Sequence, residues 1–215
     1  MKNKGRYNTK GVDEGEFEPG SNGLVLRNLQ RIKDLTELET YETKALSIVS
    51  DILIDKYDMD HCFSSKDICD MHSAWLGELY SWAGKYRQVN MSKGGFTFAA
   101  AYLIPKLMDQ FERKELRQYT PCVFKSDHEI INALAVVHTE LVLIHPFREG
   151  NGRLARLFST LMALQAGLPI LNFSRIKGEW QEQYFSAVRA GLDNDYEPMK
   201  VIFLRALSQS QQTCH

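Results

Sequence analysis

The 215-residue sequence lacks the features that mark several large classes of protein. Its charge is nearly balanced, with 26 Lys and Arg against 27 Asp and Glu, so no general basic field directs it to nucleic acid. The longest apolar stretch, residues 133–144, is interrupted by His138 and Glu140 and is too short to cross a bilayer. The first 20 residues lack the apolar core of a secretory signal. We therefore expect a cytoplasmic protein that binds neither a membrane nor a specific nucleic acid.

Cysteine is also scarce, with four residues and no closely spaced pair. A chain of this length does not need disulfides to support a core, so reduced thiols are the simpler interpretation. Cys62 and Cys69 together with His61 and His72 could be drawn as a metal site. Their spacings match no standard zinc pattern, so we do not expect one there.

The distribution of apolar residues predicts an all-α protein with one short β-hairpin. Residues 1–22 are polar and rich in glycine and are expected to form a flexible arm, with a single domain over residues 23–210. Helices are predicted in the segments 24–55 (one or two), 64–79, 102–116, 126–144, 151–166, 179–192 and 197–208.

The one departure from helical spacing lies at residues 86–98. There, β-branched and aromatic residues flank Lys93, Gly94 and Gly95, a pattern typical of a hairpin turn. Two strands are not stable alone and must lie against the body of the protein. The outer edge of the hairpin is then open to a partner chain.

The most informative segment is HPFREGNGRLAR, residues 145–156. The turn at Gly150, Asn151 and Gly152 leads into an apolar helical pattern, so backbone N–H groups and the helix dipole would face an anion such as the phosphates of a nucleoside triphosphate. The Asn151 side chain is expected to add a further donor. Glu149 cannot face phosphate alone. A Mg²⁺ ion between its carboxylate and the phosphate oxygens would remove the repulsion.

The remaining polar residues of this segment complete a group-transfer site. Arg153 and Arg156 lie three residues apart on one helix face, and their planar guanidinium groups suit phosphate oxygens. His145 precedes the turn, where an imidazole that titrates near neutrality could take a proton from an attacking hydroxyl. Each residue also has an ordinary structural role, as a helix cap, a turn or a solvated charge, but their combination in twelve residues favours a site. Phe147 is expected to be a core residue.

The segment HPFREGNGR resembles the signature of Fic-domain proteins, HPFx[DE]GNGRxxR, at every fixed position. The upstream segments LYSWAGKYR and KGGFTFA and the opening EPGSNGLVLRN are similar to Fic proteins as well. The resemblance implies a compact helical fold and an enzyme that transfers AMP from ATP to a Ser, Thr or Tyr hydroxyl of a target protein, releasing pyrophosphate. It leaves open a cytoplasmic location or delivery by a specialised secretion system.

The resemblance also implies a role for each site residue. His145 is the general base and Glu149 holds Mg²⁺, whereas the phosphates are bound by Gly150, Asn151, Gly152, Arg153 and Arg156. The hairpin is a flap that binds the target segment by strand addition, through Lys93, Gly94, Gly95 and Phe96. Tyr184 lies near the place where the family lines its adenine pocket, although a packed helix tyrosine is an equally good interpretation.

Many Fic proteins carry an inhibitory helix with the motif [ST]xxxE[GN], whose Glu pairs with the second motif arginine, here Arg156. This motif is absent from the sequence, and the nearest acidic helix, TELETYETK, does not match it. We therefore predict that any inhibition comes from a separate, small antitoxin-like protein, as in the antitoxin-regulated class.

Other activities stay open at this point. The first is phosphorylation, as in Doc-like relatives, although those have Lys where this chain has Gly152. Transfer of UMP or phosphocholine and removal of AMP are further enzymatic alternatives. A toxin–antitoxin interaction module that binds a nucleotide without catalysis is the alternative from a different class.

Overall fold

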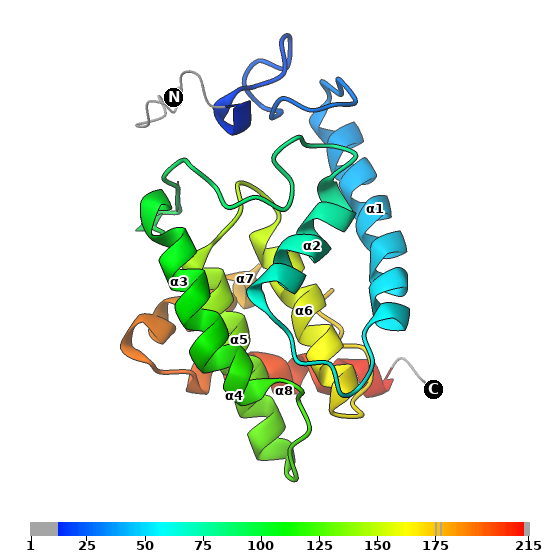
Figure 1. The fold of residues 1–215 in the computed structure, drawn as a ribbon, viewed down its shortest axis with the longest axis vertical. Helices are drawn as coiled ribbons and strands as arrows, with labels where there is room; N and C mark the ends of the chain where they lie inside the picture. Colours follow the sequence, from blue (N-terminus) through cyan, green and yellow to red (C-terminus); the bar gives the residue numbers. More distant parts are fainter. Residues whose placement is uncertain (1–12, 175, 177, 213–215) are drawn as a thin grey trace.

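Two consecutive helices, α5 (Asp127–Ile144) and α6 (Asn151–Gln165), form the centre of the fold, and residues 145–150 join them (Figure 1). The computed structural model describes residues 13–174, 176 and 178–212. Specific residues of the sequence fix the bounds of these helices. In α5, a capping box between Ser126 and Glu129 satisfies the first turn, and the helix ends at His145, which has left-handed backbone dihedrals. In α6, the positive φ of Gly150 turns the chain into the helix.

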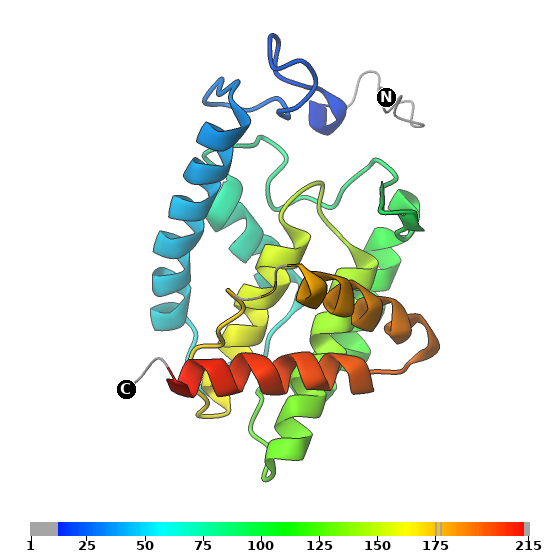
Figure 2. The same cartoon turned by 180° about the vertical axis from the view of Figure 1, so that it is seen from behind.

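The other helices pack around this pair (Figures 1 and 2). They are α1 (Leu35–Lys56), α2 (Ser65–Leu76), α3 (Ile104–Phe111), α4 (Arg117–Tyr119), α7 (Glu179–Ala190) and α8 (Glu197–Gln212). Short 3₁₀ turns lie at Asp13–Gly15, Ala101–Leu103 and Gly191–Asp193, and a π-helical turn, Glu112–Leu116, joins α3 to α4. Within the described ranges, none of the helices is both long and apolar enough to cross a membrane.

The hairpin consists of β1 (Ser92–Lys93) and β2 (Phe96–Thr97), which pair antiparallel across the turn at Gly94 and Gly95. Both glycines have a positive φ, which is what a two-residue hairpin turn requires. The predicted all-α fold with a single hairpin is therefore confirmed. Phe147, predicted as a core residue, is fully buried.

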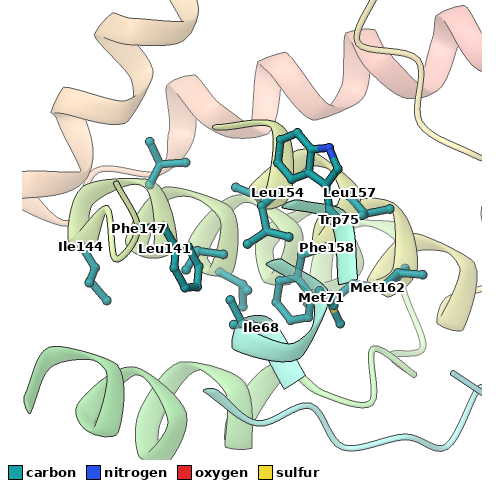
Figure 3. Close-up of a cluster of buried hydrophobic side chains, with 14 of the residues drawn as sticks. Ile68, Met71, Trp75, Leu141, Ile144, Phe147, Leu154, Leu157, Phe158 and Met162 are labelled. Carbon is teal, nitrogen blue, oxygen red and sulfur yellow. The ribbon is translucent and has the colours of Figure 1, made fainter. Parts of the chain in front are cut away.

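The core lies where α2 packs against α5 and α6. Figure 3 shows Ile68, Met71 and Trp75 of α2 beside Phe158 and Met162 of α6. The exposed fraction of each of these side chains is 2% or less. This packing brings the end of α2 close to the start of α6, so that Trp75 lies next to Gly150.

Two expectations were wrong at the N-terminal side of the fold. The first helix begins at Leu35, after the cap residue Asp34, rather than near residue 24. The apolar residues before it are not helical because the Asn28 side chain bonds to the backbone of Leu26 and Ile32 and because Arg31 has a positive φ.

The second correction concerns the N-terminal arm. Residues 13–22 are packed rather than flexible, since the buried Glu14 accepts hydrogen bonds from the backbone N–H groups of Gln88 and Val89. The Glu14 carbonyl also accepts from the Arg148 guanidinium at 2.9 Å. These bonds place the segment against the base of the hairpin and the loop after α5. Residues 1–12 of the predicted arm lie outside the described residues.

The close contact between Gly150 and Trp75 provides a test of how the loop is seated. A Cβ added at Gly150 would lie 2.7 Å from a Trp75 ring carbon, and its φ is +82°. Gly94 also has a positive φ, +56°, but a Cβ there would meet no atom within 4 Å. We predict that Gly94→Ala costs about 1 kcal/mol of unfolding free energy. Gly150→Ala should cost a further 1–3 kcal/mol or so because the core must shift.

Urea unfolding followed by circular dichroism measures both variants. The account of the loop is contradicted if Gly150→Ala is no less stable than Gly94→Ala. Both substitutions place alanine at a positive φ, but only the one at Gly150 brings a Cβ against the Trp75 ring.

Candidate active site

A cavity of about 640 Å³ opens between the hairpin, the loop 145–150 and α7. Its size is that of a typical small-ligand pocket. Three groups of residues line it: Lys93, Gly94, Phe96 and Phe98 of the hairpin; His145, Glu149, Gly150, Gly152, Arg153 and Arg156 of the motif; and Val142, Phe173, Ile176, Tyr184, Phe185 and others towards α7. The structure therefore brings the motif, the flap and Tyr184 to one cavity.

His145 lines this cavity, and one of its ring nitrogens is bound to the protein. Its Nδ1 lies 3.1 Å from the carbonyl of Val142, which can only accept, so Nδ1 carries the proton. Nε2 of the neutral ring then keeps its lone pair. Burial lowers the pKa of His145 to about 4, and the nearby Arg87 charge contributes in the same direction. The imidazole is thus neutral at physiological pH, whereas the sequence had suggested titration near neutrality.

The backbone of the loop that carries His145 is held by side chains from elsewhere. Arg87 donates to the His145 carbonyl through Nε at 2.6 Å, and its own N–H donates to Pro146 at 2.8 Å. His72 is the second support. Because its Nδ1 accepts from the Gly84 N–H at 2.8 Å, Nε2 is protonated and donates to the Glu149 carbonyl at 3.0 Å.

His72 is a structural residue and not part of a metal site. Its ring stacks on Phe147 with a centroid distance of 3.9 Å, and burial lowers its pKa to about 4. Both ring nitrogens are occupied by backbone groups, as described above. Over the part of the chain that the structure describes, no group of three or more His, Cys, Asp or Glu side chains is arranged to hold a metal ion.

The Asn151 side chain differs from expectation. Its Oδ1 accepts from the Phe147 N–H at 2.8 Å and its Nδ2 donates to the Phe147 carbonyl at 2.7 Å. Only 4% of the residue is exposed. The side chain therefore shapes the loop instead of pointing into the cavity, and Asn151 can face an anion only through its backbone N–H at the first turn of α6.

The two arginines of the motif have different partners. Arg153 pairs with the buried Glu42 of α1 at 2.7 Å and lies 3.4 Å from Glu149, with its guanidinium over the Trp75 ring at 4.7 Å. Glu42 is held by the Tyr80 hydroxyl at 2.9 Å. Among the described residues, no carboxylate pairs with Arg156.

Arg156 instead lies close to the Tyr184 hydroxyl, where its positive charge opposes the rise that burial causes in the Tyr184 pKa. Tyr184 is buried, and its hydroxyl lies 2.8 Å from Nε2 of His138. His138 is completely buried, and burial lowers its pKa to about 3, so it is neutral and can accept from Tyr184. The bond to His138 fixes the Tyr184 hydroxyl, and Tyr184 and Arg156 both line the cavity, so Tyr184 is at once a packed residue and a cavity residue.

The flap forms the opposite wall. Lys93 Nζ lies 5.9 Å from the centre of the Phe185 ring on α7, across the cavity. Phe98, just after β2, stacks on the His145 ring with a centroid distance of 3.7 Å. Gly94 and Gly95 form the exposed tip, and Phe96 lines the cavity. The flap thus contacts α7 through Lys93 and the motif through Phe98.

Several residues of this site were not identified from the sequence. They are Glu14, Glu42, His72, Arg87, Phe98 and His138. Arg87 and Phe98 lie in the segments LYSWAGKYR and KGGFTFA and Glu42 in TELETYETK, but nothing in these short segments indicates which distant carbonyl or guanidinium each side chain reaches.

Comparison with known proteins places this geometry in a family. Residues 62–163 match the Fic/DOC family. The chain is 26% identical over 150 residues to a "Probable protein adenylyltransferase Fic" of Salmonella typhimurium, covering 68% of this chain and 70% of that protein. It is 28% identical over 190 residues to the "Protein adenylyltransferase VbhT" of Bartonella schoenbuchensis, where the match covers 86% of this chain but 37% of VbhT.

Solved structures show the same fold. The VirB-translocated effector BepC of Bartonella tribocorum, with bound AMPPNP, superposes with a TM-score of 0.71 at 22% identity over 91% of this chain and 97% of that chain. The Fic domain of a VirB-translocated Bep effector from Bartonella quintana, with bound ADP, gives a TM-score of 0.71 at 22% identity, covering 90% and 94% of the two chains. Residues 62–163, which contain the complete motif at the cavity, therefore form a domain of the Fic/DOC family.

Proposed function

We propose that this protein is a protein adenylyltransferase, which transfers AMP from ATP to a hydroxyl of a target protein and releases pyrophosphate. The observation that carries the proposal is the position of the neutral His145 ring at one cavity with the N-terminus of α6 and the open edge of the flap. These three elements supply a base, an anion site and a place for a peptide. The relatives from Salmonella typhimurium, Bartonella schoenbuchensis and Nematostella vectensis carry names with the words protein adenylyltransferase, which supports the same reaction.

His145 is the general base of this reaction. Its Nε2 accepts the proton of the target hydroxyl while the oxygen forms a bond to the α-phosphorus. The bond from that phosphorus to the bridging oxygen breaks, and the electron pair leaves with pyrophosphate. Because the pKa of His145 is lowered to about 4, the base is already unprotonated at neutral pH. We therefore expect the basic form of the enzyme to persist well into the acid range.

The phosphates lie against the N-terminus of α6 in this proposal. Gly150 and Gly152 allow close approach of the backbone, and the N–H groups of the first turn of α6, including that of Asn151, face the anion. Arg153 and Arg156 neutralise the phosphate chain and the charge on the leaving group. Tyr184 lies further along the cavity wall with apolar residues of α7, where the nucleotide base fits.

The site also fits a divalent cation. Glu149 is 44% exposed at its side chain and lines the cavity, so one carboxylate can meet the phosphate oxygens there. Mg²⁺ commonly uses one or two carboxylates, with phosphates and water as its other ligands. When bound, the ion would neutralise charge on the phosphates and orient them.

The target is held by the flap. Main-chain bonds to the edge formed by Lys93, Gly94, Gly95 and Phe96 would align an extended segment beside His145 with little demand on its sequence. We place the reaction in a cytoplasm, either of the cell that makes the protein or of one to which it is delivered.

Intact-mass spectrometry tests this function most simply. The protein is incubated with ATP and Mg²⁺ alone and with candidate targets. We predict the added mass of AMP on target or enzyme, and that His145→Ala abolishes transfer while ATP still binds, because the base acts on the nucleophile. His128→Ala, on the exposed first turn of α5, serves as the control and should transfer normally.

Other outcomes decide between the alternatives. The added mass of a phosphate would show a Doc-like kinase, and the masses of UMP or phosphocholine would show those transfers. Loss of AMP from a modified protein would show the reverse reaction. Binding of ATP with no transfer under any condition would favour a toxin–antitoxin interaction module without catalysis.

Inhibition by a separate, antitoxin-like protein is the second part of the proposal. A groove of about 310 Å³ between α1 and α6 is also lined by Arg153 and Arg156, and no described carboxylate of this chain pairs with Arg156. An acidic side chain from a partner would find that guanidinium there. Glu42 already pairs with Arg153, but it is buried and bonded to Tyr80, which indicates a support for the site.

We predict that the chain expressed alone transfers AMP from labelled ATP with Mg²⁺. The matched variant is Glu42→Gln, which removes the charge of the internal partner of Arg153 and keeps its shape. The prediction is that its activity stays the same or falls. A chain that is inactive until part of it is removed, or that gains activity with Glu42→Gln, would contradict inhibition by a separate protein.

A further inference from the structure

Arg87 connects two parts of the active site that are far apart in the sequence. Its side chain is 1% exposed, so its guanidinium has no contact with bulk water. A buried guanidinium is costly unless its donors are satisfied. Within the described residues, it is satisfied by backbone carbonyls and forms no ion pair at hydrogen-bond distance.

The carbonyls belong to two groups. Nη1 donates to Val89 at 2.8 Å and Nη2 to Ala99 at 2.6 Å, and these residues precede β1 and follow β2. Nε donates to His145 at 2.6 Å, and Nη2 also reaches Ile144 at 3.4 Å. One rigid fork thus joins both ends of the flap to the end of α5.

The residue that Arg87 holds has a strained backbone. His145 has φ 53° and ψ 59°, a left-handed conformation that a residue with a side chain adopts at a cost. The hydrogen bond to its carbonyl helps to maintain this conformation, which sets the direction of the imidazole. Phe98 of the flap meets the ring of the same histidine. The flap is therefore connected to His145 in two ways. Arg87 links the backbone of the flap to the backbone of His145, and the Phe98 ring contacts the His145 ring.

We propose that Arg87 is a positioning residue that couples the flap to His145, so that a strand bound at the flap edge also fixes the orientation of the imidazole. The inference rests on the proposed function for its effect on transfer. The coupling itself concerns the backbone and can be measured without any reaction. Arg87 does not line the cavity, so it acts through His145 and not on the nucleotide.

The test uses Arg87→Lys in the full chain. Lysine keeps the charge but offers one ammonium group, which cannot reach carbonyls on both sides at once. We expect the rate constant for AMP transfer to fall about 10- to 100-fold, as for a misplaced catalytic group, while the dissociation constant for ATP stays within about twofold. Hydrogen exchange should rise together in peptides covering residues 89–99 and 141–150.

Gln165→Met provides the matched control. Gln165 is also buried and also bonds to backbone groups, those of Asp58, His61 and Cys122, but at the opposite end of α6. This variant should lower the melting temperature without changing the transfer rate constant or the exchange at residues 141–150, both measured well below that temperature.

Two results would overturn the coupling: an Arg87→Lys protein that is less stable but transfers AMP at the normal rate, or faster exchange at the flap with none at residues 141–150. If the wild-type chain transfers no AMP, the proposed function fails and the exchange data alone decide the coupling. If Arg87→Lys does not fold, Phe98→Leu tests the coupling of the flap to His145 through the ring contact between them. It should raise exchange at residues 141–150, and unchanged exchange would count against the proposal.

Discussion

The active site depends on the hydrogen bonding of one short backbone segment, the loop between α5 and α6. Arg87 donates to the His145 carbonyl through its side chain and to the Pro146 carbonyl through its backbone N–H. The Asn151 side chain bonds to both the N–H and the carbonyl of Phe147, and the His72 side chain donates to the Glu149 carbonyl. A loop of this kind would normally be mobile, because it has no secondary structure of its own. Here its conformation is set by side chains from α2, from the segment before the flap and from the first turn of α6. The directions of His145, Glu149 and the N-terminus of α6 follow from that conformation.

Electrostatics then distinguishes the groups that the loop presents. His72 and His138 are buried and His145 is partly buried at the cavity, and burial lowers the pKa of each, so all three are neutral hydrogen-bonding groups at physiological pH. Positive charge reaches the cavity from the two arginines of α6 and also from Lys93 and Arg189. Arg153 is partly neutralised by Glu42, whereas Arg156 pairs with no carboxylate of the described residues and lies close to the neutral Tyr184 hydroxyl. The site thus combines an uncharged base with a positive wall, as transfer to a hydroxyl from a phosphate chain requires.

The sequence predicted the helices and the site motif better than it predicted the supports of the site. α5 was predictable because Ser126 and Glu129 cap its start and Pro146 follows its end, so each signal lies within a few residues of the helix end that it marks. The segment before α1 was mispredicted because its apolar spacing is helical, while Asn28 bonds to the backbone in a way that spacing does not reveal. Glu14 was taken as part of a flexible arm because its partners lie more than 70 residues away.

The same reason explains the roles that were missed at the site itself. His145 and Glu149 could be named because the residue types of one motif identify them. Arg87 and Glu42 could not, since their importance lies in contacts with distant carbonyls and a distant guanidinium. Asn151 shows the converse case. Its residue type suggested a phosphate donor, but the fold uses both of its polar atoms to shape the loop.

The central claim is that the loop directs His145 towards the phosphorus that becomes attached to the target. A crystal structure of the chain with Mg²⁺ and a non-hydrolysable ATP analogue tests it directly, through the distances from His145 Nε2 to each phosphorus atom. The account predicts that the α-phosphorus is the nearest, with the terminal phosphates directed towards Arg153 and Arg156. An analogue bound in the reverse direction, with its γ-phosphorus nearest to His145, would contradict AMP transfer and indicate transfer of a phosphate.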